Sequence, residues 1–109
     1  MIAISEIQDY EGKLYSYYDD QLNFTGEFLL CGKEITNVEI FLEFRGKGNG
    51  KKMIEEIFNR FPSVEYVLKV HFDNEVAQKL YENLGFKYTG KIDLGMFYWM
   101  KIVFPLIQL

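Results

Sequence analysis

A glycine-rich run at residues 45–51, Arg-Gly-Lys-Gly-Asn-Gly-Lys, constrains this chain more than any other segment. It lies between a stretch with apolar residues at every second position and a stretch with apolar residues at helical spacing. A strand that passes through such a turn directly into a helix leaves several backbone N–H groups unpaired at the helix N-terminus. These groups and the positive end of the helix dipole both favour an anion. The run therefore predicts a phosphate-binding turn, and the alternative is an ordinary flexible turn with two lysines.

Spacing excludes two well-known nucleotide loops. The P-loop needs a glycine, four residues and then Gly-Lys-Ser/Thr, but here Lys52 follows Gly50 and Lys51, and Arg45 replaces the first glycine. The dinucleotide fingerprint needs Gly-x-Gly-x-x-Gly, and its last glycine is a lysine here. The pattern that fits is Arg-x-x-Gly-x-Gly, formed by Arg45, Gly48 and Gly50.

The hydrophobic pattern predicts a single α/β domain over residues 1–109, with a mixed, mostly antiparallel sheet and two main helices. Strands are expected at 13–18, 24–30, 38–44, 64–70, 86–92 and 96–103, and helices at about 53–61 and 76–84. The strand before residue 45 and the strand after residue 63 should be parallel, joined by the first helix. Apolar faces are expected from Val38, Ile40, Leu42 and Phe44 on one strand and from Val76, Ala77, Leu80, Tyr81 and Leu84 on the second helix. Asp73 or Asn74 can cap that helix, and Gly85 suits its end, with Phe86 packed back on Tyr81.

Charge and cysteine content limit the function classes. A net charge of −4 argues against nucleic acid as a partner, because phosphate neutralisation needs a basic surface. The local basic cluster around the glycines instead suits a small polyanion. The single cysteine, Cys31, excludes an internal disulfide, and we predict a cytoplasmic location with no membrane segment.

Two segments together resemble the GNAT N-acetyltransferases. Residues 44–54 look like the acetyl-CoA loop of that family, and residues 74–86 look like its second motif, Asn-x-x-Ala-x-x-x-Tyr-x-x-x-Gly-Phe. A predicted strand separates them, and the resemblance covers roughly residues 35–104. It implies a GNAT-like fold and an acetyl-CoA-dependent N-acetyltransferase in which an amine attacks the thioester directly in a ternary complex.

The resemblance also implies roles for particular residues. The pyrophosphate of acetyl-CoA should bind the loop, and the pantetheine arm should contact the preceding backbone; the residues involved are Ile40, Phe41, Leu42, Arg45, Gly46, Lys47, Gly48, Asn49, Gly50 and Lys51. Asn74 should contact the pantetheine, and Tyr81 should protonate the leaving thiolate. Two residues depart from the family pattern: Leu42 replaces a common proline, and Asn49 replaces a small aliphatic residue.

A general base must take a proton from the amine. Glu39 and Glu43 should lie on the strand face opposite the core, and we choose Glu39, although an exposed glutamate on a strand is commonly just solvated. Tyr81 can also be explained by packing on Phe86, but phenylalanine would serve that packing equally well. The only histidine, His71, has no ligand set at metal spacing around it, so no metal site is predicted.

The region before residue 13 is too short for the helix pair with which family members build the acceptor pocket. This leaves two alternatives to an enzyme acting on a small-molecule or peptide amine: a CoA-binding or regulatory module without catalysis, and an α+β interaction domain with a fortuitous glycine turn. The aromatic-rich segment after residue 95 can belong to the core, or it can help a second copy complete the acceptor pocket and cover an edge strand as a homodimer.

Overall fold

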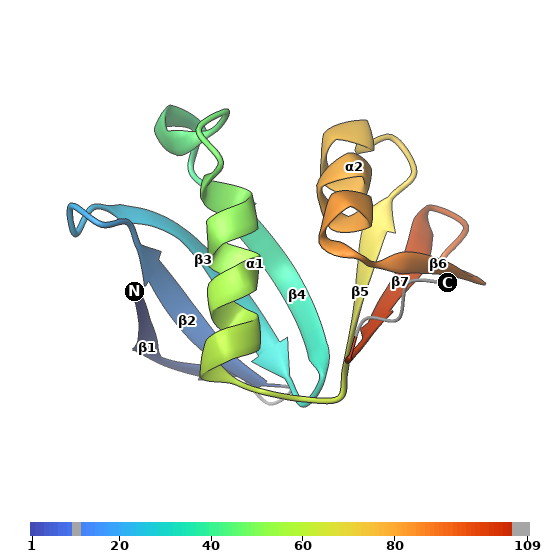
Figure 1. Ribbon diagram of the computed structural model, residues 1–109, viewed down its shortest axis with the longest axis horizontal. Coiled ribbons are helices and arrows are strands. Elements are labelled where there is room, and N and C mark those ends of the chain that lie inside the picture. Colours follow the sequence, from blue (N-terminus) through green and yellow to red (C-terminus); the bar gives the residue numbers. More distant parts are fainter. Residues whose placement is uncertain (10–11, 106–109) are drawn as a thin grey trace. The chain divides into compact units, whose positions relative to one another are not determined.

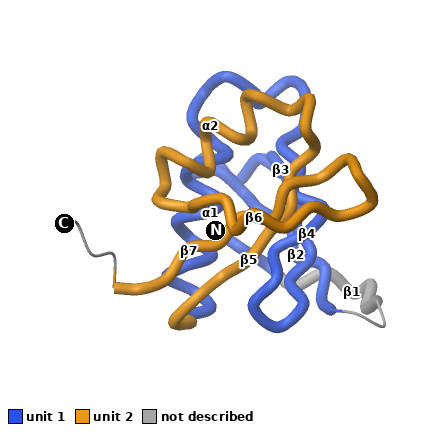
Figure 2. Tube along the Cα trace, turned by 90° about the vertical axis from the view of Figure 1, so that its right-hand side faces the viewer, with its two compact units in different colours: residues 1–62 blue, residues 63–109 orange. Residues whose placement is uncertain are grey.

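The computed structural model describes residues 1–9 and 12–105 (Figure 1). Contacts divide the chain into two compact units, residues 1–62 (unit 1) and residues 63–109 (unit 2), coloured separately in Figure 2. The single domain expected over residues 1–109 stays a prediction. Among the described residues, no helix has the length and apolar character needed to cross a membrane.

Unit 1 is an antiparallel sheet followed by a helix. Its elements are β1 (Ile2–Asp9), β2 (Gly12–Tyr18), β3 (Phe24–Cys31), β4 (Glu34–Ile40), the 3-10 turn η1 (Leu42–Phe44) and α1 (Asn49–Arg60). Each strand pairs with the next along the chain, as in Ile2 opposite Tyr17 and Leu30 opposite Ile35. The strand–turn–strand pattern predicted at 13–30 is confirmed.

The helix α1 covers one face of this sheet (Figure 1). Met53, Ile54 and Ile57 are completely buried, as their helical spacing predicts. On the sheet, the ring of Tyr15 stacks on Phe28 with centroids 5.3 Å apart and meets the ring of Phe61, just after α1, at 4.8 Å. The faces of β2 and β3 that carry these rings are therefore the ones turned to α1.

The strand predicted at 38–44 ends early. β4 stops at Ile40, and η1 replaces its expected continuation. Asn37, with a φ of 51°, lies where the register of β3 against β4 shifts, so the strict alternation is interrupted. The predicted core face is accordingly wrong at Leu42, whose side chain is 79% exposed. Glu43 is also misplaced, since it belongs to the turn and not to a strand.

Unit 2 contains β5 (Glu65–His71), α2 (Glu75–Leu84), β6 (Lys87–Asp93) and β7 (Phe97–Val103), close to the predicted boundaries. β7 pairs antiparallel with both β5 and β6, so β6 forms an edge of the sheet. Met100 and Ile102 are buried in β7, whereas Phe97, Tyr98 and Trp99 are half-buried. The aromatic-rich segment thus contributes to the core through part of its residues.

Both ends of α2 carry the predicted caps. The Asn74 Oδ1 accepts the N–H of Ala77 at 3.1 Å. At the other end Gly85 has a φ of 109°, and the N–H of Phe86 donates to the Tyr81 carbonyl at 3.0 Å. The rings of Tyr81 and Phe86 pack edge to face 5.7 Å apart, which confirms the predicted contact. The predicted apolar face is wrong at Val76, which is 83% exposed.

Candidate functional site

The glycine run forms an open turn that leads directly into α1. Gly46 and Gly48 have φ values of 74° and 81°, and a Cβ at either position would meet no atom within 4 Å. Positive φ therefore explains the two glycines, and the space beside them is free of this chain's own atoms. Among the described residues, no acceptor is found for the backbone N–H groups of residues 46–51; the first helical bond is from Lys52 to Gly48, at 3.2 Å.

The two helices differ sharply at their N-termini. α2 has the Asn74 side chain as a cap and Glu75 in its first turn. α1 has the left-handed Gly48 at its cap position, no side-chain cap and no acidic residue in its first turn. Lys47, Lys51 and Lys52 are exposed around it and add positive charge to the positive end of the dipole. Unpaired N–H donors and excess positive charge fit the pyrophosphate of acetyl-CoA.

Two side chains of the glycine run form hydrogen bonds to nearby backbone carbonyls. The Arg45 Nε donates to the Ile40 carbonyl at 2.6 Å, and the Asn49 Nδ2 donates to the Phe44 carbonyl at 2.9 Å. Asn49 is only 9% exposed, whereas Arg45 is an exposed residue. The structure therefore gives Arg45 a contact within the chain that the sequence did not predict.

The backbone expected to meet the pantetheine is only partly extended. Ile40 is opposite Gly26, and the Phe41 N–H donates to the Thr25 carbonyl at 2.9 Å, so the N–H and C=O of Ile40 point away from β3. The Phe41 carbonyl accepts the N–H of Phe44 within η1, at 2.8 Å. The extended backbone predicted through Leu42 is therefore wrong. Because the Ile40 carbonyl already accepts the Arg45 Nε, the Ile40 N–H is the group best placed for a strand-like ligand.

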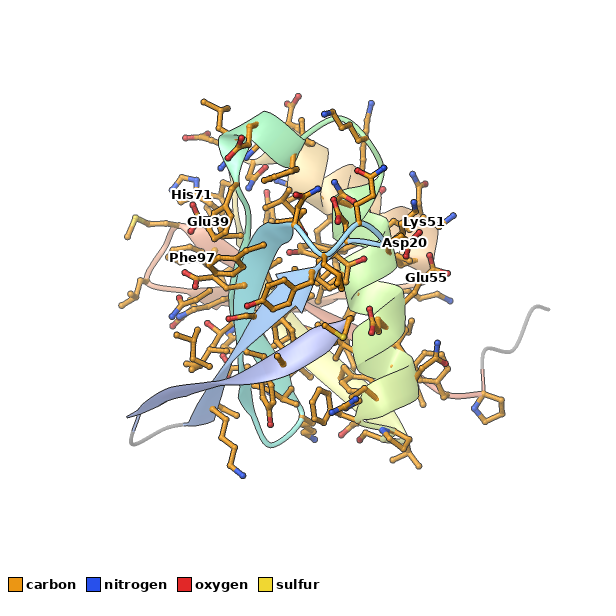
Figure 3. All side chains as sticks on the ribbon, turned by 90° about the vertical axis from the view of Figure 1, so that its left-hand side faces the viewer. Asp20, Glu39, Lys51, Glu55, His71 and Phe97 are labelled. Carbon is orange, nitrogen blue, oxygen red and sulfur yellow. The ribbon has the colours of Figure 1, made fainter. Side chains whose placement is uncertain are left out.

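A polar hollow of about 330 Å³ lies in unit 1 beside the start of α1. It is lined by Tyr17, Asp19, Asp20, Gln21, Asn23, Phe44, Lys47, Asn49 and Lys52. Figure 3 shows Asp20 and Lys51 on the side of the sheet where α1 lies, and Glu39 on the other. The Asp19 carboxylate accepts the N–H groups of Gln21 and Asn23, both at 2.9 Å, and its pKa is lowered, chiefly by the bond from Asn23. Asp19 therefore shapes the turn between β2 and β3.

Tyr81 has a buried ring and an available hydroxyl. The residue is 6% exposed, and burial raises the pKa of its phenol to about 12. No hydrogen bond to its hydroxyl is found among the described residues, and none of their fully buried side-chain oxygens or nitrogens lacks a partner. The hydroxyl oxygen is therefore not fully buried.

Asn74 precedes Tyr81 by two helical turns, on the same side of α2. Its Oδ1 is used in the cap, so its Nδ2 is the donor that remains for a ligand. The helix is fixed to the end of β5 by Gln78, whose Nε2 donates to the carbonyls of His71 and Phe72 at 3.0 and 2.9 Å. Unit 2 thus holds both of its predicted site residues on one short, anchored helix.

Glu39 is exposed on β4, directly opposite Glu27 on β3. Since Phe28, the neighbour of Glu27, faces α1, these carboxylates lie on the opposite face. Sequence reasoning missed Glu27, because only the register of the two strands reveals the pair. Two opposed carboxylates repel each other and are stabilised by a cation.

His71 has a structural contact: its Nδ1 accepts the N–H of Asp73 at 3.1 Å. Among the described residues, no group of three or more His, Cys, Asp or Glu side chains is arranged to hold a metal.

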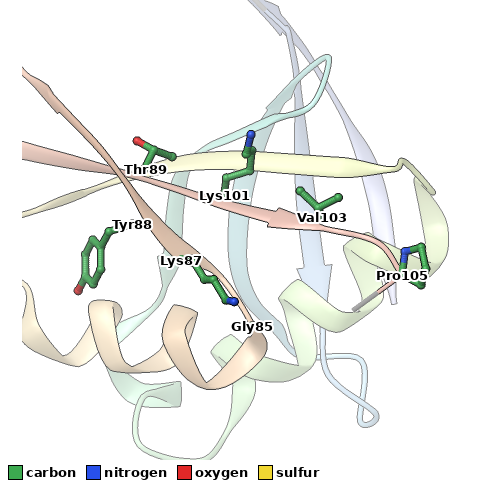
Figure 4. A pocket seen from close by; sticks show the side chains of 7 residues that line it. All are labelled: Gly85, Lys87, Tyr88, Thr89, Lys101, Val103 and Pro105. Carbon is green, nitrogen blue, oxygen red and sulfur yellow. The ribbon is translucent and has the colours of Figure 1, made fainter. Parts of the chain in front are cut away.

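Another hollow, of about 440 Å³, opens in unit 2 (Figure 4). Its lining, Gly85, Lys87, Tyr88, Thr89, Lys101, Val103 and Pro105, includes none of the predicted site residues.

Comparison with known proteins agrees with this geometry. A sequence model described as the acetyltransferase (GNAT) family matches residues 12–86, more than half of the chain. No curated protein sequence matches the chain.

Solved structures share the fold. An acetyltransferase from Bacillus subtilis in complex with CoA is 13% identical, with 94% of this chain and 97% of that one covered and a TM-score of 0.74. A spermidine N-acetyltransferase from Vibrio cholerae in complex with CoA and spermine is 22% identical, with 86% and 66% covered and a TM-score of 0.70. A dodecameric form of the Vibrio enzyme is 24% identical, with 87% and 66% covered and a TM-score of 0.69. The chain thus spans about two thirds of the Vibrio protein.

Proposed function

The chain belongs to the GNAT acetyltransferase family, and from this premise we propose that it transfers the acetyl group of acetyl-CoA to an amine by direct attack in a ternary complex. Membership confirms the resemblance drawn from the two motifs, together with the GNAT-like α/β fold, the enzyme class and acetyl-CoA as cofactor. The observation that carries the proposal is the uncapped, lysine-rich start of α1 with its unpaired N–H groups.

We propose that these N–H groups bind the pyrophosphate, assisted by Lys47 and Lys51. The Ile40 N–H and the Asn74 Nδ2 would then bind the amide groups of the pantetheine arm. Phe41 and Leu42 keep their proposed place beside it, although part of their backbone bonding lies within the turn. Bound acetyl-CoA supplies an acetyl group on a thioester, and attack by the amine forms the C–N bond and breaks the C–S bond.

The chain must then move two protons. Glu27 beside Glu39 helps to attract the cationic form of the amine, which must release one proton to solvent to become the neutral nucleophile. Glu39 is the proposed base that then takes the second proton from the attacking nitrogen as the C–N bond forms. Tyr81 is the proposed donor to the departing thiolate. Because the pKa of its phenol is about 12, its hydroxyl carries the proton at neutral pH.

The acceptor is proposed to be a cationic amine. The net charge of −4 and the Glu27–Glu39 pair favour such a substrate. The Vibrio protein was solved with spermine, so polyamines belong in the first panel of acceptors beside peptides with a free amino group.

A second copy is proposed to cover the edge strand β6, and the dodecameric form of the Vibrio enzyme gives this assembly a precedent among proteins of the same fold.

One observation favours the alternative, a CoA-binding or regulatory module. In the described part of the chain, β1 and β2 pair as a hairpin, and no α-helix precedes α1. The same experiment separates the two functions: calorimetry with acetyl-CoA and CoA, followed by measurement of thiol release with the amine panel. Saturable binding with thiol release supports the transferase, whereas binding without release across the panel supports the module. Absence of binding refutes both.

A further inference from the structure

We propose that the side chain of Asn49 is a positioning residue that holds the glycine turn in its anion-binding shape. This inference rests on the proposed function, because it concerns the same pyrophosphate site. It assigns to the side chain a task separate from that of the Asn49 backbone N–H, which belongs to the unpaired set at the start of α1.

Burial is the first observation. Asn49 is 9% exposed although its neighbours Gly48 and Lys51 are exposed. Asn49 and Thr25 are the buried polar residues among those described. A buried amide is costly unless it is bonded, and the Asn49 Nδ2 has the Phe44 carbonyl at 2.9 Å.

The position of this bond along the chain is the second observation. It joins the end of η1 to the first residue of α1 and so closes a short loop around Gly46 and Gly48. Glycine loses more conformational entropy on folding than any other residue. A loop that contains two glycines is therefore strongly stabilised by a hydrogen bond that joins its two ends. The small aliphatic residue that the family pattern has here could not donate this bond.

Arg45 supplies a second tie of the same kind. Its Nε donates to the Ile40 carbonyl at 2.6 Å and spans η1. In both hydrogen bonds, a side chain of the glycine run donates to a backbone carbonyl that precedes it by five residues. Asn49 is the better test of the idea, since it is uncharged and cannot act by direct charge attraction.

The test compares the wild-type chain with Asn49→Ala and, as matched control, Asn59→Ala on the exposed side of the same helix. Affinity for CoA and for inorganic pyrophosphate is measured by calorimetry, and amide hydrogen exchange is measured without ligand. Loss of one neutral hydrogen bond should weaken both ligands about threefold to tenfold. Exchange at the bonded amides on either side of the turn, those of Phe44, Arg45 and Lys52, should rise by a similar factor, while strands β2 and β3 remain protected.

Asn49→Leu fills the same space without a donor and replaces the alanine variant if that variant unfolds. Unchanged affinity and unchanged exchange at Phe44, Arg45 and Lys52 would overturn the inference, as would a uniform rise of exchange through unit 1. If the wild type binds neither ligand, the proposed function fails. The exchange comparison then still decides whether Asn49 orders the turn.

Discussion

Tyr81 shows how one side chain can serve packing and chemistry together. Its ring packs on Phe86 at the end of α2, while its hydroxyl finds no partner among the described residues. A phenylalanine would make the same packing contact, so the packing alone leaves the hydroxyl unexplained. Because burial raises the pKa of this phenol to about 12, the hydroxyl keeps its proton at neutral pH and can donate it to a ligand.

Replacement of Tyr81 by phenylalanine should therefore lower kcat with any accepted amine, by about 10²–10⁴ if the residue is the acid. The affinity for CoA should stay nearly constant, since the ring is retained. Tyr18→Phe, the same change on β2 in unit 1, is the control and should leave kcat near the wild-type value. A Tyr81→Phe enzyme with wild-type kcat across the pH range would remove this residue from the mechanism.

The same residue should make the fold sensitive to alkali. Unfolded, its phenol titrates near 10.0, and folded near 12, so both states are protonated below pH 10. Between pH 10 and 12 only the unfolded state loses the proton. The Tyr81 phenol alone should therefore lower the free energy of unfolding by about 2–3 kcal/mol over this range. In urea titrations, Tyr81→Phe should lose correspondingly less stability over that range. Parallel curves for the two proteins from pH 8 to 12 would contradict the buried phenol.

At the scale of elements, the two helices follow opposite rules at their N-termini. α2 is capped by Asn74 and carries Glu75 in its first turn. α1 has no side-chain cap and no acidic residue in its first turn, where it carries Lys51. An arrangement that weakens a free helix but favours a bound anion is expected where a ligand completes the helix.

Exchange of Lys51 for glutamate should therefore separate stability from binding. Lys51→Glu should raise the free energy of unfolding by about 0.3–1 kcal/mol, because the acid then suits the dipole, and should weaken CoA binding. Arg60→Glu makes the same charge change in the last turn of α1 and is the matched control, which should lower stability instead. Denaturant titration and calorimetry measure the two effects. A Lys51→Glu variant that binds CoA as tightly as the wild type would show that no anion is held there.

Elements with strong local signals were predictable. The caps of α2 follow from Asn74 and Gly85, and the turn before α1 follows from the spacing of its glycines. The end of β4 was not predictable, because the alternation continues in the sequence to Phe44 while the chain leaves the strand after Ile40 and forms η1. Glu27 and the tie from Asn49 were also missed, since both depend on contacts across the fold that no local pattern encodes.

At the scale of the whole molecule, the distribution of charge and the exposed edge strand of the sheet influence which partners can bind. The chain carries −4 overall, yet the start of α1 is locally basic. Such a charge distribution favours a polyanion at the start of α1 and cations elsewhere on the molecule. It also lets identical chains associate, because modest net charge opposes assembly only weakly at physiological salt.

Self-association is the last prediction, and β6 is the surface on which it depends. This edge strand of unit 2 is exposed along nearly its whole length, and Ile92 and Leu94 in and after it are 58% and 75% exposed. An edge strand has unpaired backbone groups, and this one also exposes the large side chains of Tyr88 and Ile92, which a second copy can cover. Sedimentation at tens of micromolar should give a dimer, and Ile92→Asp should shift it to monomer. Val76→Asp, the same kind of change at an exposed position on α2, should leave the dimer intact. A wild-type chain that sediments as a monomer, or a dimer unaffected by Ile92→Asp, would mean that β6 is not the interface.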